Sequence, residues 1–145
     1  MNERFIAKDF AIITLLTGIW VNISELFRYF GYVRPEMQEF FTSIPQMGTI
    51  WDLQIILVWG FFDILLTALF VFTFWLCARA FGNNRKSILI SGIMSWCFFF
   101  VLFWVGSANM FLADWSTLLV VLPLALVETV VASYIASKLY TRRSA

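Results

Sequence analysis

Asp63 and Glu128 are carboxylates placed within long apolar stretches of the sequence. Asp63 follows the expected start of its apolar helix by about twelve residues, or about 18 Å at 1.5 Å per residue. That depth is close to the middle of a hydrocarbon core about 30 Å thick, and Glu128 has a similar depth in a later stretch. An ionised acid there costs about 2.5–3.5 kcal/mol on insertion scales. Each acid should therefore be protonated, paired or in contact with water.

Polar residues also interrupt the first apolar stretch, within the sequence GIWVNISELFRYF (18–30). Asn22, Glu25 and Arg28 recur every three residues, which places them on one side of a helix. Such a stripe favours contact with other helices over contact with lipid. We expect Arg28 to pair with Glu25 on its own helix or with Asp52 on the next.

These patterns predict a polar interior to which several helices contribute. Its principal residues are expected to be Asn22, Glu25, Arg28, Asp63, Thr67 and Glu128. Small residues at helical spacing are expected to pack the third and fourth helices together: Ser91, Ser95, Ala125, Thr129 and Ser133. Because the interior has three carboxylates and one arginine, it is more suited to cations or protons than to anions.

The same residues have a structural explanation. Carboxylates within spans also serve as hydrogen-bonding groups between helices, with no transport or chemistry. Asp52 and Asp114 are explained equally well as caps at helix starts, where they favour the exposed N–H groups and the helix dipole. Glu25 and Arg28 are compatible with a solvated position among the lipid headgroups. The sequence alone leaves both explanations open.

The helices that carry these residues are predicted from composition and hydropathy. The chain has 145 residues, of which 61% are hydrophobic and 13% are charged. A soluble domain is about half apolar and about a quarter charged. Four apolar stretches near or above about 20 residues predict an all-α integral membrane protein, a four-helix bundle of two hairpins in a single domain over residues 1–145. The expected spans are 10–30, 51–81, 87–106 and 115–138.

A short amphipathic helix is expected between the first and second spans, over residues 35–44. Gly31 and the pair Arg34–Pro35 predict the end of the first helix, because the residue before a proline disfavours the α-helical conformation. Apolar residues then recur at helical spacing, which is typical of a helix lying on the membrane surface.

Lysine and arginine favour one orientation. The N-terminal residues, the turn at 82–86 with its flank and the C-terminal tail hold eight of the ten, and the opposite side holds Arg28 and Arg34. By the positive-inside rule, both termini are expected in the cytoplasm. Short loops, this bias and the lack of a cleavage pattern after the first stretch lead us to expect a multi-pass protein of a bacterial inner membrane.

Several classes of chemistry are disfavoured. The chain has no histidine, which removes the commonest general base and the commonest haem and zinc ligand. Cys77 and Cys97 lie in apolar stretches without C-x-x-C spacing and are predicted to be structural thiols. We therefore expect no cofactor, no metal site and no catalytic residue. A net charge of +1 argues against nucleic-acid binding.

Three classes of function remain. The one we favour is a small transporter or channel for protons, cations or a small solute, which would use the mid-membrane carboxylates and work as a homo-oligomer because four helices are few for a complete pathway. The alternative is a non-catalytic accessory or scaffold subunit that docks on a partner membrane subunit. The third, an intramembrane enzyme with a lipid-like substrate, is disfavoured because the sequence offers no nucleophile–base pair, metal set or phosphate-binding glycine loop.

Overall fold

The computed structural model describes residues 6–40 and 53–143, and over these ranges the chain is helical apart from short turns. It has four continuous helices that are long and apolar enough to cross a membrane, which confirms this part of the fold prediction. The first helix comprises α1, η1 and α2, and the third comprises α4, η2 and α5. In chain order the segments are α1 (Ala7–Arg28), the π-helical η1 (Tyr29–Val33), α2 (Arg34–Phe40), α3 (Leu53–Phe81), α4 (Arg85–Ser95), the π-helical η2 (Trp96–Val101), α5 (Leu102–Asn109) and α6 (Trp115–Arg143).

The first helix does not end where the sequence predicted. Arg34 has φ −63° and ψ −49°, which are α-helical values despite the proline that follows, and the helix continues to Phe40. The prediction of a separate surface helix over 35–44 is therefore wrong for residues 35–40, which extend the first helix. Residues 41–44 lie outside the described ranges. The reason for the continuation is local. In η1 the N–H of Arg34 bonds to the carbonyl of Tyr29, and this wider turn absorbs an extra residue directly before the proline ring.

The second helix ends where it was predicted to end, and the third and fourth are longer than predicted. Residues 51 and 52 of the second expected span lie outside the described ranges, and α3 ends at Phe81. The third helix covers Arg85–Asn109 and is longer at both ends than predicted. The fourth helix, α6, continues to Arg143, beyond the predicted end at 138.

The turn between α3 and α4 has the residues that such a reversal requires. Gly82 has φ +80°, a left-handed conformation that glycine adopts without steric cost after a helix. Asn84 caps the next helix, because its side chain accepts a hydrogen bond of 3.1 Å from the N–H of Ser87.

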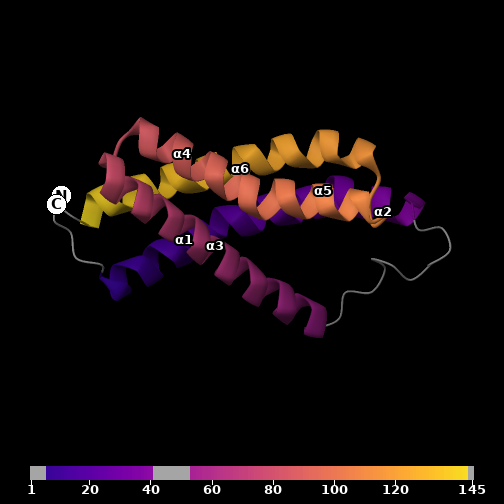
Figure 1. Ribbon diagram of the computed structural model, residues 1–145. Helices are drawn as coiled ribbons and strands as arrows, with labels where there is room; N and C mark the ends of the chain where they lie inside the picture. The colour runs from indigo at the N-terminus through magenta and orange to yellow at the C-terminus, as the bar shows by residue number, and fades with distance from the viewer. Residues whose placement is uncertain (1–5, 41–52, 144–145) are drawn as a thin grey trace.

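The helices form a bundle in which α1 and α4 each pack against both α3 and α6. Figure 1 shows α3 crossing the other helices obliquely, so that its Leu53 end lies apart from them. Consistent with this, every residue from Leu53 to Phe62 is exposed except the half-buried Gly60. The core lies elsewhere, in two buried apolar clusters: Val21, Leu66, Phe70, Phe100, Ala125 and Ala132, and Ile13, Val71, Phe74, Ala78 and Ala136.

Small residues bring α4 and α6 into close contact. A Cβ on Gly92 would lie 2.8 Å from Cγ2 and 2.9 Å from Cα of Val130, so the two backbones approach as only glycine allows. The residues predicted to pack these helices are all buried in the structure: Ser91, Ser95, Ala125, Thr129 and Ser133. The small-residue faces of α4 and α6 are thus occupied within the chain.

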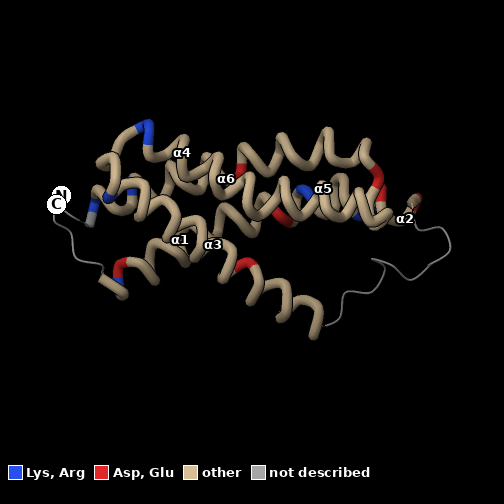
Figure 2. Tube along the Cα trace, in the orientation of Figure 1, with Lys and Arg blue, Asp and Glu red and all other residues tan. Residues whose placement is uncertain are grey.

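Basic residues gather at one end of the bundle, where α1 begins, α3 turns into α4 and α6 ends (Figure 2). Acidic residues lie further along the helices as well as at the ends. The distribution of charge along the bundle is therefore strongly asymmetric.

Candidate functional site

Arg28 is the centre of an ion network that joins α1 to α6. Its Nη1 donates to Oε2 of Glu128 at 2.7 Å, and its Nη2 pairs with Oε1 of Glu25, one turn earlier in α1. The side chains of Arg28 and Glu128 are 4% and 0% exposed. A buried charge that loses its partner is strongly destabilising, so each member of this network depends on the others.

Two further side chains of α1 position Glu128. The hydroxyl of Ser24 donates to Oε2 of Glu128 at 2.8 Å, and Nε1 of Trp20 donates to the backbone carbonyl of Glu128 at 3.1 Å. Trp20, Ser24 and Arg28 are spaced by four residues, so they follow one another along one face of α1. Oε1 of Glu128 is buried and has no hydrogen-bond partner among the residues that the structure describes.

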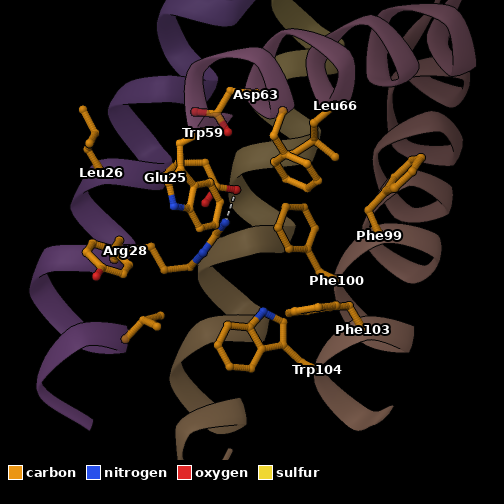
Figure 3. A pocket seen from close by; sticks show the side chains of 13 residues that line it. Glu25, Leu26, Arg28, Trp59, Asp63, Leu66, Phe99, Phe100, Phe103 and Trp104 are labelled. Carbon is orange, nitrogen blue, oxygen red and sulfur yellow. Dashed lines mark hydrogen bonds and ion pairs between the residues drawn. The ribbon is translucent and has the colours of Figure 1, made fainter. Parts of the chain in front are cut away.

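A cavity of about 190 Å³ lies beside this network (Figure 3). In Figure 3, α1 stands on one side of it and the segments η2 and α5 on the other, with α3 contributing Asp63 and Trp59. Glu25, Arg28 and Asp63 supply its charged groups, whereas Glu128 is bonded to Arg28 and does not line the cavity. The lining residues are Glu25, Leu26, Arg28, Tyr29, Val33, Trp59, Phe62, Asp63, Leu66, Phe99, Phe100, Phe103 and Trp104.

Asp63 presents a carboxylate to this cavity. The residue is only 6% exposed, and its Oδ1 has no hydrogen-bond partner within residues 6–40 and 53–143. Thr67, one turn later, donates at 2.7 Å to the backbone carbonyl of Asp63, so its hydroxyl does not satisfy the carboxylate. A buried acceptor without a donor is costly, and such an atom requires an explanation, for which a bound water or ion, a catalytic role and local strain are the usual candidates.

Aromatic rings form most of the remaining wall. Trp59 and Phe62 meet edge to face at 5.7 Å between ring centroids, and Phe103 and Trp104 do the same at 5.7 Å. The guanidinium of Arg28 lies 4.6 Å from the centroid of the Phe100 ring, a cation–π contact. The cavity thus combines carboxylates at one side with aromatic faces around them.

Both π-helical segments contribute to this cavity. η1 supplies Tyr29 and Val33, and η2 supplies Phe99 and Phe100. Single π turns within α-helices are rare and are found often at functional sites, because the extra residue redirects the side chains of one turn. Their presence on two sides of one cavity is an observation independent of its charge.

The structure brings together only part of the predicted polar interior. Glu25, Arg28 and Asp63 share the cavity, and Glu128 is bonded to Arg28. Asn22 is separate from them. Its side chain donates to the carbonyl of Gly18 at 2.8 Å, and it lines a different cavity of about 390 Å³ with residues of α1 and Ile64 of α3. Asp52, one of the two partners expected for Arg28, lies outside the described residues.

The aromatic wall and the groups that hold Glu128 were not predicted from the sequence. Trp59, Phe62 and Leu66 do recur at the helical spacing that places them beside Asp63. That signal is weak, because the chain has 17 phenylalanines and 7 tryptophans. The spacing of Trp20, Ser24 and Arg28 was a clearer signal that was not used.

The structure offers few groups for a metal or cofactor. Across the described residues, no cluster of three or more histidine, cysteine, aspartate or glutamate side chains is placed to hold a metal ion. Cys77 and Cys97 are free thiols, and Cys77 is buried. No family model, curated protein or solved structure matches this chain. The chemistry of the cavity is therefore the basis for any functional assignment.

Proposed function

We propose that this is a multi-pass membrane protein that moves protons or small cations across the bilayer, with Asp63 as the carboxylate that binds them. The observation that carries the proposal is that Asp63 lines a cavity and that its buried Oδ1 lacks a partner among the described residues. A carboxylate used only to hold helices together would accept hydrogen bonds from a neighbouring helix. A proton or a cation satisfies this oxygen instead.

The charge balance of the site favours a positive solute. Arg28 is already engaged by Glu25 and Glu128, so its charge is matched within the ion network. Asp63 contributes a further carboxylate, and the described residues that line the cavity include no second basic residue to balance it. An anion would meet this excess of negative charge at short range in a poorly screened site.

Flux measurements on proteoliposomes test the proposal. Purified protein is reconstituted with a trapped pH-sensitive dye, and proton uptake is followed after a membrane potential is imposed; sodium and potassium fluxes are measured in parallel. The wild type should carry a flux that Asp63→Asn abolishes, because asparagine keeps the size of the side chain and removes its charge. Asp114→Asn is the matched control, since Asp114 is exposed and does not line the cavity.

Folding must be checked in the same samples. If Asp63→Asn retains the helical content and the elution volume of the wild type but loses the flux, the carboxylate is required for transport. Equal fluxes in wild type, Asp63→Asn and protein-free liposomes would overturn the proposal.

The proposed orientation places both termini in the cytoplasm of a bacterial cell, with the protein in the inner membrane. It is supported by the gathering of basic residues where α1 begins, α3 turns into α4 and α6 ends (Figure 2). In this orientation α2 and the end of α5 lie towards the outer side, and the cavity beside Asp63 lies in the outer half of the bundle.

An accessory or scaffold role is the second candidate, and one observation favours it. The stretch Leu53–Phe62 of α3 diverges from the bundle and exposes apolar side chains, which a second copy or a partner subunit would cover (Figure 1). The small-residue rows on α4 and α6 do not support this role, because their residues are buried within the chain. Native mass spectrometry of protein extracted from its own membrane distinguishes a homo-oligomer from a complex with another polypeptide at fixed stoichiometry.

A further inference from the structure

We infer that the cavity beside Asp63 binds a small organic cation, an amine or quaternary ammonium whose charge is surrounded by apolar groups. This inference rests on the proposed role of Asp63 as a cation-binding carboxylate and adds the chemical class of the solute. Its basis is that one cavity is lined both by Asp63, whose buried Oδ1 is unsatisfied, and by an aromatic wall.

The aromatic content of the wall is the first argument. Seven of the thirteen lining residues are tryptophan, phenylalanine or tyrosine: Tyr29, Trp59, Phe62, Phe99, Phe100, Phe103 and Trp104. The face of an aromatic ring carries negative potential and attracts a cation within about 6 Å of its centroid. Rings that surround a quaternary ammonium group are a common way for proteins to bind such ligands.

The cavity already contains a contact of this kind. The guanidinium of Arg28, a delocalised and weakly hydrated cation, lies 4.6 Å from the centroid of the Phe100 ring. Arg28 also pairs with Glu25 and Glu128, so one cation in this structure is held by carboxylates and an aromatic face together. Asp63 with Trp59 and Phe62, which come from the same part of α3, offers a second set of the same groups.

Inorganic cations fit the cavity less well. Calcium takes about six to eight oxygen ligands, and magnesium requires a nearly octahedral set. Apart from Asp63, the acidic group in the described lining is Glu25, which is already paired with Arg28. A metal ion would therefore exchange most of its water for hydrocarbon, whereas a quaternary ammonium ion is weakly hydrated and gains contact with the rings.

Size and access agree with a small amphiphilic ligand. The volume of about 190 Å³ is below the range of about 300–1,000 Å³ found for pockets that hold drug-sized molecules. Leu26, Phe62 and Phe103 line the cavity and are also 46%, 50% and 63% exposed at the surface of the bundle. The cavity therefore opens sideways between helices, on a surface that lipid chains would cover in the proposed membrane location.

A pair of probes of equal shape tests the inference. Choline carries a trimethylammonium group, and 3,3-dimethylbutan-1-ol replaces it with an uncharged tert-butyl group of the same shape. Binding of each to the purified full chain in lipid nanodiscs is measured by isothermal titration calorimetry. We expect saturable binding of choline and binding of the alcohol that is weaker by about tenfold or more. Equal binding of both, or no saturable binding of choline, would overturn the inference.

Variants then assign the binding to this cavity. Asp63→Asn should weaken choline binding by about tenfold or more, and Asp114→Asn should leave it unchanged. Phe62→Leu should weaken it by about threefold, whereas Phe61→Leu should not, because Phe61 is adjacent in α3 but does not line the cavity. Wild-type affinity in both Asp63→Asn and Phe62→Leu would place the binding elsewhere and refute the assignment.

The two proposals fail separately. Proton flux that depends on Asp63, together with no choline binding, would retain the transport proposal and overturn the organic cation. Choline binding that depends on Asp63, without flux of protons, choline or metal ions in liposomes, would retain the binding site and overturn transport.

Discussion

Nη1 of Arg28 in α1 donates to Oε2 of Glu128 in α6 at 2.7 Å, although 100 residues separate them in the chain. The same carboxylate oxygen accepts a hydrogen bond from Ser24 at 2.8 Å, and the guanidinium also pairs with Glu25. The contact therefore fixes the axial position of the first helix relative to the last beside the cavity. Stability measurements on these residues report on that arrangement independently of any function.

Arg28→Ala should destabilise the protein more than the loss of any surface charge. Removal of the guanidinium leaves Glu128 buried beside Ser24 as its only described side-chain donor, and breaking a buried pair costs about 3–5 kcal/mol. Unfolding in mixed micelles with increasing denaturing detergent gives the free-energy difference. Arg79→Ala is the control, because Arg79 is exposed and its described contact is with the Trp75 ring at 5.2 Å. Similar losses in both variants would contradict the structural role of Arg28.

Ser24→Ala tests the second hydrogen bond to Glu128. A hydrogen bond to a charged group contributes about 1.5–3 kcal/mol, so the same unfolding assay should show a loss in this range. Ser116→Ala is a matched control, because the hydroxyl of Ser116 also donates to a carboxylate, that of Asp114, but at an exposed position. The control should change stability by less than about 0.5 kcal/mol. A larger effect of Ser116→Ala than of Ser24→Ala would be inconsistent with the network.

Gly92→Ala tests the close approach of α4 to α6. The added methyl group would lie 2.8 Å from Cγ2 of Val130, and relief of such overlap typically costs about 1–3 kcal/mol. Gly106→Ala should instead be neutral or stabilising by up to about 1 kcal/mol, because alanine favours a helix and its methyl group would meet no described atom within 4 Å beyond its own stretch of helix. Thermal unfolding of the two variants should therefore shift in opposite directions or differ clearly in size.

Cysteine labelling tests the proposed orientation. In a background with Cys77→Ala and Cys97→Ala, single cysteines are placed by Ala80→Cys near the turn between α3 and α4 and by Phe111→Cys after α5; both positions are exposed. A membrane-impermeant maleimide added to intact cells should react at position 111 but reach position 80 only after the membrane is permeabilised. The reverse pattern would invert the topology, and labelling of both in intact cells would exclude this arrangement of spans.

Asp63 and Arg28 were identifiable from sequence because a charged residue in an apolar stretch departs from what lipid or a core favours. The number of helices followed from the same hydropathy. The partner of Arg28 did not follow completely: Glu25 was expected from spacing within one helix, but Glu128 depends on the axial register between α1 and α6. That register is set by the packing of the two helices, so it cannot be inferred from the sequence of either helix alone.

Two other features could not be predicted from local sequence rules. Gly31 and the preference of the residue before proline for extended conformations predicted a helix end at residue 30, but the helix continues through the π turn of η1 and Arg34 is α-helical. The aromatic wall could not be recognised because the chain has 17 phenylalanines and 7 tryptophans, too many to single out those beside Asp63. Only the oblique crossing of α3 shows which rings, such as Trp59 and Phe62, meet around Asp63.

The π turns also change how positions on these helices must be counted. Arg28 and Val33 are both buried and both line the cavity, although they are five residues apart, and Ser95 and Phe100 are both buried at the same separation. Five residues of a regular α-helix correspond to a rotation of about 140° beyond a full turn, which would place such pairs on different faces. In a mutational or cross-linking scan of either helix, the helical periodicity must therefore be fitted separately to the residues before and after the π turn. A scan analysed with one unbroken period would assign exposed positions beyond residues 33 and 101 to the interior.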